Sequence, residues 1–207
     1  MSASVSRAAV AVVLIAGGLS PAAGQSSEPT HLECAGPFGA DSSEALLRQV
    51  FGDDHIRDET IDGPEGTTLD ATLVFPDDPE RRLIVLWWDE AARTRPAAII
   101  IREDSNWMGP GGVHLGAALT DVEAINGAPF ALLGFGWDYG GAASFPEGAL
   151  AEIPGGCVLS LSFDLDWTRD FGPEFDAIMG DQQIPSSDSV MRSADPRVSE
   201  IAVGYPE

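Results

Sequence analysis

The first regular pattern along the chain is that of a short amphipathic helix. Asp41 and Glu44 stand three residues apart, as in a capping box, with Asp41 as the expected cap. Apolar residues then recur at helical spacing, at Leu46, Leu47, Val50 and Phe51. Gly52 follows the last of them, and glycine commonly ends helices. The pattern therefore predicts a helix that opens at Asp41 and ends before Gly52.

Strand patterns follow this helix. Residues 68–75 largely alternate between apolar and polar positions, which is typical of a strand with one buried face. Residues 83–88 are apolar on both faces and predict a central strand. Residues 97–101 predict a further short strand.

The second half of the chain repeats this order. Thr120 and Glu123 have the spacing of a second capping box, and Asn126-Gly127 is expected to end the helix that they open. Strand patterns then follow at 130–137, 142–150 and 157–165, and the last of these alternates most clearly.

The remaining C-terminal part shows less periodicity. Residues 166–197 are rich in Asp, Ser and Pro and predict a long loop, with one weak helical stretch around 174–179. Residues 198–205 alternate again and predict a final strand at the edge of the sheet.

The two halves share a short motif of cap, glutamate, alanine and aliphatic residue, at 41–46 and again at 120–125. We therefore expect an α+β protein, mostly β, made of two related helix-plus-antiparallel-meander units over 25–112 and 113–207. Because the motif is short, chance similarity is the alternative explanation.

The N-terminal residues predict export. Arg7 precedes an apolar run over 8–19 that is too short for a membrane-spanning helix. Small residues at 22–24 suit cleavage before Gln25, so we interpret 1–24 as a signal peptide and expect a periplasmic or secreted protein. A retained N-terminal membrane anchor is the alternative. No other segment of the sequence has the length and apolarity of a membrane span.

The charge of the chain is strongly negative. The sequence has 33 acidic residues against 11 basic ones, all arginine, and a formal net charge of -22. This charge disfavours nucleic acids and anionic membrane surfaces as partners, because like charges repel, and it leaves a basic partner open. Solubility alone is the alternative explanation. With 44% hydrophobic residues the chain can still form a hydrophobic core.

The two cysteines, Cys34 and Cys157, are expected to form a disulfide, because an exported protein folds in an oxidising compartment. Two buried free thiols are the alternative.

Motifs for catalysis, metals and cofactors are weak. The three histidines stand in different segments without ligand spacing, so no metal site is expected. The oxygen-bearing residues over 164–170 copy the spacing of a calcium loop, but Arg169 and Phe175 occupy the glycine and glutamate positions. The sequence has no Gly-x-Ser-x-Gly nucleophile motif and no lysine for a phosphate-binding loop. We therefore expect no cofactor and no catalytic residue.

The most informative segment is Phe135-Gly136-Trp137-Asp138-Tyr139-Gly140-Gly141, where rings alternate with glycines. Large aromatic side chains beside glycines favour flat surfaces suited to protein partners. The partner-binding surface predicted from this segment and from other tryptophans comprises Phe135, Trp137, Asp138, Tyr139, Trp88 and Trp107. The alternative is a hairpin whose tryptophan and tyrosine complete the core.

The aromatic segment, read with the helix stop before it, resembles a group of uncharacterised bacterial envelope proteins over about residues 113–165. The tandem helix-plus-meander layout is similar to the beta-lactamase inhibitor protein fold and to small lipoproteins of outer-membrane assembly. These groups act by binding other proteins, which the resemblance implies here. The chain departs from them in lacking a lipid-attachment cysteine at the cleavage point, and no functional residue carries over.

These observations favour an exported, non-catalytic protein that binds an unidentified protein of the cell envelope. A periplasmic hydrolase with acidic residues drawn from loops, and a structural envelope protein, are the alternatives.

Overall fold

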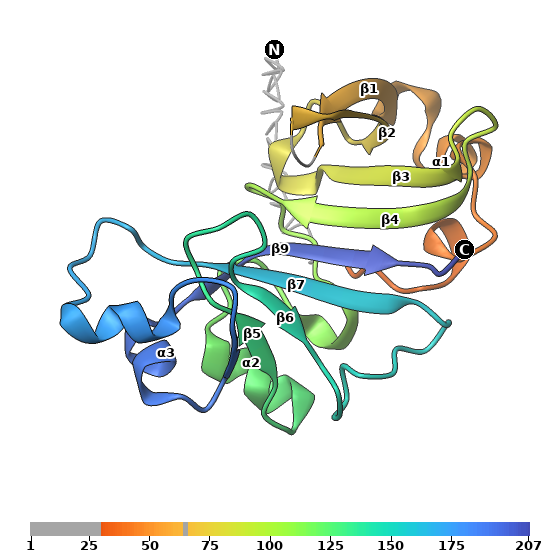
Figure 1. The fold of residues 1–207 in the computed structure, drawn as a ribbon. Coiled ribbons are helices and arrows are strands. Elements are labelled where there is room, and N and C mark those ends of the chain that lie inside the picture. The colour runs from red at the N-terminus through yellow and green to blue at the C-terminus, as the bar shows by residue number, and fades with distance from the viewer. Residues whose placement is uncertain (1–29, 64–65) are drawn as a thin grey trace, which may run out of the picture.

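A computed structural model describes residues 30–63 and 66–207, so the predicted signal peptide lies outside the described residues. The described strands form one antiparallel sheet in the order β1-β2-β3-β4-β9-β7-β6-β5-β8 (Figure 1). The strands are β1 (Ile56–Asp62), β2 (Thr68–Val74), β3 (Leu83–Asp89), β4 (Thr94–Arg102), β5 (Ala131–Leu133), β6 (Ala142–Ser144), β7 (Val158–Asp164), β8 (Gln183–Pro185) and β9 (Arg197–Gly204). The expected class, α+β and mostly β, is confirmed.

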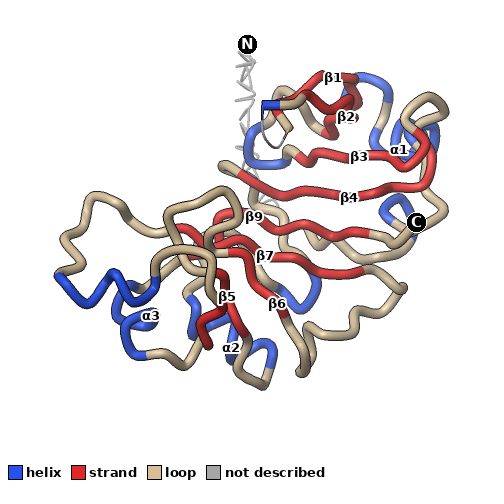
Figure 2. The backbone as a smooth tube through the Cα atoms, in the orientation of Figure 1, coloured by secondary structure: helices blue, strands red, loops and turns tan. Residues whose placement is uncertain are grey.

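The α-helices of the described chain are short. The first precedes β1, and the other two lie between strands of the sheet in sequence (Figure 2). They are α1 (Glu44–Phe51), α2 (Leu119–Asn126) and α3 (Ser189–Ala194), and a 3-10 helix, η6 (Pro173–Ile178), precedes β8. No helix within 30–63 and 66–207 is long and apolar enough to cross a membrane.

The helix ends agree with the sequence pattern better than the helix starts do. Gly52 and Gly127 follow α1 and α2 with φ of 92° and 72°, the region in which glycine is favoured. The expected N-caps are wrong. The cap of α1 is Ser43, which accepts a hydrogen bond from the Leu46 amide at 3.2 Å, and α2 begins at Leu119, one residue before Thr120.

The most important correction concerns the last strand. β9 was expected at the edge of the sheet, but it lies in the centre and pairs with β4 on one side and β7 on the other. Its core-facing Ile201 and Val203 are completely buried. An antiparallel strand with one covered face alternates in the same way at an edge or in the centre, so the pattern does not distinguish the two positions.

The second half departs further from the expected boundaries. The predicted strands 130–137 and 142–150 are shortened to Ala131–Leu133 and Ala142–Ser144, because the chain turns at the glycines after Leu133 and at Pro146. The predicted loop 166–197 contains η6, β8 and α3.

The main core covers one face of the sheet only. On that face, side chains from all of the long strands pack against α1, α2 and the connecting loops, with Leu47, Val85, Ile99, Leu161 and Ile201 fully or almost fully buried. A second and much smaller apolar cluster lies on the opposite face, formed by Ala71, Leu73 and Ile84. The opposite face is therefore buried around this cluster and exposed at Trp88, Val158 and Ser160.

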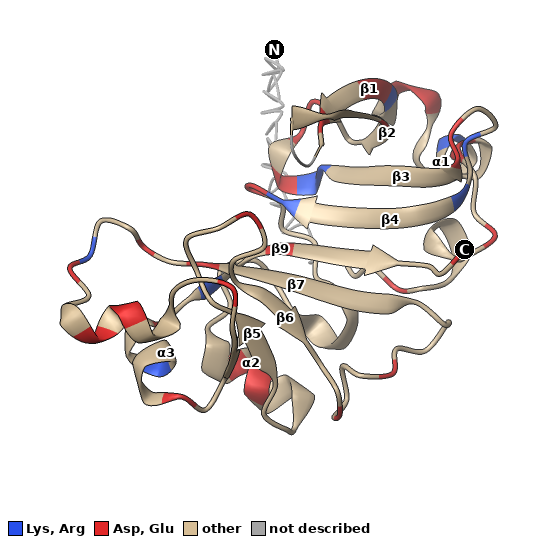
Figure 3. Cartoon of the chain, viewed as in Figure 1, with Lys and Arg blue, Asp and Glu red and all other residues tan. Residues whose placement is uncertain are grey.

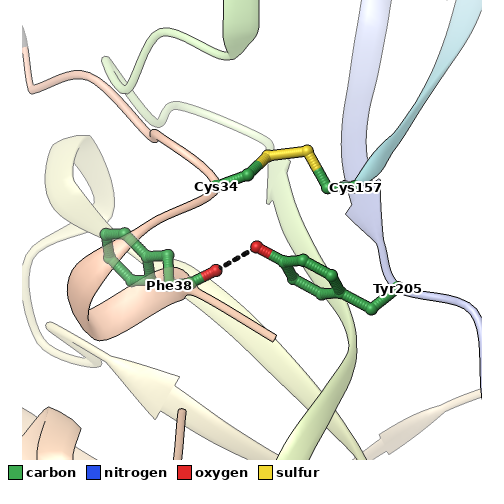
Figure 4. Close-up of a disulfide and its surroundings, with 4 residues drawn as sticks. All are labelled: Cys34, Phe38, Cys157 and Tyr205. Atoms are coloured by element: carbon green, nitrogen blue, oxygen red, sulfur yellow. Dashed lines mark hydrogen bonds between the residues drawn. A yellow bond between two sulfur atoms is a disulfide. The ribbon is translucent and has the colours of Figure 1, made fainter. Parts of the chain in front are cut away.

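The predicted disulfide is present and joins Cys34, near the start of the described chain, to Cys157 at the start of β7 (Figure 4). Close by, the hydroxyl of Tyr205 donates a hydrogen bond to the Phe38 carbonyl. The cysteines are 123 residues apart, and closing a loop of that length stabilises a fold by about 4 to 5 kcal/mol in the chain-entropy model. Both contacts fix the N-terminal segment to the centre of the sheet.

Candidate functional site

The candidate site is the open face of the four central strands, β3, β4, β9 and β7. Alternate side chains of these strands point away from the main core. Strand pairing aligns them in two rows, Leu86–Ala98–Gly204–Val158 and Ile84–Ile100–Ala202–Ser160. We call these residues, together with Trp88, the open face.

The open face carries no charged side chain. Figure 3 shows acidic and basic residues in the loops and at the strand ends, whereas the middle of these strands is almost free of them. Charged residues stand in the rows on both sides of the open face, with Arg102–Glu200–Ser162 on one side and Arg95, opposite Trp88, on the other. In a protein with a formal net charge of -22, the nine open-face residues therefore form an uncharged area within a sheet face that carries charge around them.

No helix lies in front of these four strands in Figures 1 and 2. Val158 is 63% exposed and Trp88 is 42% exposed, so the large apolar side chains at the margins of the open face contact solvent. The Trp88 indole donates a hydrogen bond to the Tyr205 carbonyl at 2.9 Å, which fixes its ring beside the end of β9. Trp88 is therefore one predicted partner-binding residue that lies on this surface.

Phe135 and Trp107 do not belong to any exposed surface, and their prediction as partner-binding residues is wrong. Each is only 2% exposed. Trp107 packs edge-on against Phe38 and donates to the Arg81 carbonyl at 2.8 Å, while the Phe135 backbone pairs with the segment after η6. These two rings are part of the core.

Trp137, Asp138 and Tyr139 form the tip of the β5–β6 connection, where Tyr139 is 53% exposed and Trp137 is partly buried. The two rings meet edge-to-face at 5.4 Å between centroids. This connection ends beside the last residues of β7, since the Phe163 amide donates to the Gly141 carbonyl. Trp88, on β3, lies toward the opposite ends of the central strands, so at about 3.3 Å per residue it is at least about 20 Å from this tip. The predicted residues therefore do not make a single patch.

The sequence interpretation missed a second aromatic group at the end of β7. Phe171 and Phe175 stack at 4.4 Å, and Trp167 meets Phe175 edge-on. Trp167 is 53% exposed and donates from its indole to Asp164 at 2.9 Å. The regular spacing of three rings in an otherwise polar segment was the signal that pointed to this group.

A carboxylate pair between α1 and the sheet bears on the hydrolase alternative. Burial alone would raise the pKa of Glu44, but hydrogen bonds, first that from Arg48, outweigh burial and hold the pKa below its usual value. Burial raises the pKa of Asp58, and the neighbouring Glu44 raises it further. Opposed shifts of this kind occur in acid–base catalysis.

The contacts of Glu44 nevertheless favour a structural role for this pair. Arg48 contacts one of its carboxylate oxygens at 2.8 Å, and Arg93 contacts the other at 3.2 Å. The second oxygen also accepts a hydrogen bond from Thr72, which in turn accepts from Trp87 at 2.9 Å. Because both oxygens are occupied, Glu44 ties α1 to the sheet and offers no free oxygen to a substrate.

Within the described ranges no three His, Cys, Asp or Glu side chains lie close enough together to hold a metal ion. No protein-family model, curated protein or solved structure matches the chain. The interpretation of the site therefore rests on its geometry and charge.

The different burial of Phe135 and Tyr139 predicts that replacing each by alanine changes the free energy of unfolding by very different amounts. Phe135→Ala should lower the free energy of unfolding by about 3 to 5 kcal/mol, because it leaves a cavity in the core. Tyr139→Ala should change it by less than about 0.5 kcal/mol, because that ring is on the surface. Urea unfolding of both variants checks this, and equal losses would contradict the assigned positions.

The environment of Glu200 predicts that the free energy of unfolding depends on pH. Burial raises its pKa above the usual value, although Arg102 opposes the shift. A carboxyl with a raised folded-state pKa favours folding while protonated, and its ionisation costs stability as the pH rises through that pKa. Glu200→Gln should therefore be more stable than the natural protein at neutral pH, and the difference should vanish below about pH 4. Unfolding measured across this range, with Glu90→Gln as an exposed control, tests the sign. A variant that is less stable at neutral pH would contradict it.

Proposed function

We propose that this protein is an exported, non-catalytic binding protein that holds a partner protein against the open face of its sheet. The observation that carries the proposal is that the nine open-face residues are uncharged in a protein whose net charge is -22, and that Val158 and Trp88 among them are exposed. With 33 acidic residues in 207, random placement would put between about one and two carboxylates on nine positions. Their exclusion is expected where a partner displaces water, since burying an unpaired charge is costly.

The size of the open face suits a binding site. With about 4.8 Å between strands and about 3.3 Å per residue, the residues span a footprint of about 300 Å². Ile84 within it is buried, so the exposed apolar patch is smaller than this footprint. The largest such patch on a typical monomer covers about 300 to 600 Å² and is often functional. The mixture of Trp, Leu, Ile, Val and small residues also resembles the core of a protein interface, where charged residues are depleted.

The export part of the proposal is supported by two features. Residues 1–24 have the pattern of a signal peptide. The disulfide between Cys34 and Cys157 is of a kind that persists in oxidising compartments. We accordingly propose a periplasmic or secreted location and a partner in the cell envelope.

We also propose that the two halves arose as related units. The order α1-β1-β2-β3-β4 has the same form as α2-β5-β6-β7-β9, apart from the insertion of η6, β8 and α3 before β9. The last strands of the two units, β4 and β9, pair antiparallel at the centre. This arrangement supports a duplication in which the units share one sheet.

The chain offers a matched pair of variants to test the binding proposal. Val158 is on the open face and Val50 is on α1, which packs on the covered face, and both side chains are at least half exposed. Val158→Lys should weaken capture of the partner from envelope extract at least tenfold, because the charge is buried in the complex. Val50→Lys should leave capture unchanged, and both variants should retain the melting temperature of the natural protein.

Quantitative mass spectrometry of captured proteins measures this difference. Equal capture by both variants, with unchanged melting curves, would contradict binding at the open face.

A further inference from the structure

We infer that β1 is a second binding site, at which an extended basic segment of a partner protein adds to the sheet as a further strand. The site lies at one edge of the sheet and is distinct from the open face, so it goes beyond the proposed function. The length of this edge, the direction of its backbone groups and the charges along it support the assignment.

The two edges of the sheet differ in their capacity to accept a strand. β8, at one edge, has three residues and ends in Pro185, which cannot donate a backbone hydrogen bond. β1, at the other edge, has seven residues without proline or glycine, and its pairing with β2 continues over the whole strand without a bulge (Figure 1). Short strands, proline and bulges commonly block strand addition, and β1 has none of these features.

Alternate residues of β1 direct their backbone groups away from β2. The Phe75 amide donates to the His55 carbonyl at 2.7 Å, and the Gly63 amide donates to the Thr67 carbonyl at 2.8 Å. These two hydrogen-bonded pairs flank β1, and in an antiparallel ladder such pairs alternate with pairs that do not bond to each other. The odd-numbered residues of β1 therefore bond to β2, whereas the even-numbered residues direct their N–H and C=O groups outward.

The outward backbone groups of Asp58, Thr60 and Asp62 are available to a partner. Arg48 donates to the outward carbonyl of Ile56 at 3.4 Å, which agrees with the alternation and occupies the start of the edge. No loop or side chain among residues 30–63 and 66–207 bonds to the outward groups that follow, and the three residues that carry them are exposed. The free run from 58 to 62 has about the length of a typical strand, which is five to six residues.

The charges along this edge are mainly acidic. β1 contains three carboxylates, at Asp58, Glu59 and Asp62, and a single arginine. That arginine, Arg57, is already paired with Asp77 at 2.9 Å and lies 3.5 Å from Glu59. Asp62 forms no ion pair with the described part of the chain. Lysine or arginine on an added strand would therefore meet carboxylates that the protein has not neutralised.

The other arginines near β1 are held by a carboxylate of α1. Arg48 contacts Glu44 at 2.8 Å, and Arg93 contacts the same side chain at 3.2 Å. Arg93 lies farther from Asp58, at 3.6 Å. The positive charge behind the edge is thus shared with Glu44, and the edge itself stays acidic.

The same charges disfavour a second copy of this chain at the edge. Two β1 strands that pair antiparallel about Thr60 would set Asp58 of each copy opposite Asp62 of the other, and like charges directly opposite are destabilising. The partner is therefore a different protein, with lysine or arginine at alternate residues of an extended segment.

A blocked peptide of alternating lysine and valine, about nine residues long, tests this site in titrations of the ¹⁵N-labelled, disulfide-bonded protein followed by NMR. We expect the amides of Asp58, Thr60 and Asp62 to exchange with solvent at least about tenfold more slowly in the complex, because they become hydrogen-bonded. The same peptide with glutamate in place of lysine should bind at least about tenfold more weakly.

Methylation of the peptide's backbone nitrogens separates strand addition from attraction between charges alone. In antiparallel pairing, the lysines opposite Asp58 and Asp62 direct their own N–H groups toward β1. N-methylation of the lysines should therefore abolish binding at constant charge. N-methylation of the valines, whose N–H groups point away from β1, should change the affinity by less than about twofold.

Variants of the protein test the same site. Thr60→Pro removes an outward N–H that the sheet does not use, so it should weaken peptide binding at least about tenfold and leave the melting temperature nearly unchanged. Asp62→Lys should also weaken binding, whereas Glu152→Lys, at an exposed position in the loop before β7, should not. Val158→Lys, which alters the open face, should bind the peptide like the natural protein.

The assignment of β1 is overturned if the acidic peptide binds equally well, if methylation of the lysine and valine nitrogens has the same effect, if amide protection falls outside β1, or if the basic peptide does not bind. It is also overturned if sedimentation shows a dimer that Thr60→Pro abolishes. Should Thr60→Pro fail to fold, the methylated peptides and Asp62→Lys still decide the question. Loss of peptide binding in Val158→Lys would place the peptide on the open face and reject β1.

Discussion

The pairing of β9 with both β4 and β7 is the constraint on which the rest of the structure depends. The last strand in sequence joins two meanders that would otherwise each end in a free edge. Ile201 and Val203 on one side of β9 are buried in the main core, and Ala202 and Gly204 on the other side form the floor of the open face. The same backbone therefore holds the fold together and presents the candidate site. The disulfide at the start of β7 strengthens this centre by fixing the N-terminal segment to it.

The sequence predicted local structure better than long-range arrangement. Helices near 44–51 and 119–126, the strand 83–89 and the alternating strand 158–164 follow from periodicity and glycine stops. The central place of β9 did not follow, because its pairing depends on segments about 100 residues away along the chain. The lengths of β5 and β6 were overestimated. Apolar residues in turns that pack against the core give the same sequence pattern as strand residues.

The candidate site was predicted only in part, for a related reason. Aromatic residues were predicted to bind a partner because they are large. Phe135 and Trp107 are instead buried in the core, which large side chains also fill. The open face depends instead on Ala98, Ala202, Gly204 and Ser160, which are inconspicuous in sequence and become adjacent only when β4, β9 and β7 pair. What identifies the surface is a group of uncharged residues on four adjacent strands, and the order of those strands cannot be known before the fold is.

Site-specific photo-crosslinking tests the central claim, that the open face binds a protein partner, most directly. A benzophenone amino acid in place of Ser160 lies in the middle of the open face, and the same amino acid in place of Val50 lies on α1 as the control. After irradiation in cells that export the protein, the account predicts a discrete crosslinked protein from position 160 and none from position 50. No adduct at position 160, or the same adducts at both positions, would contradict the claim.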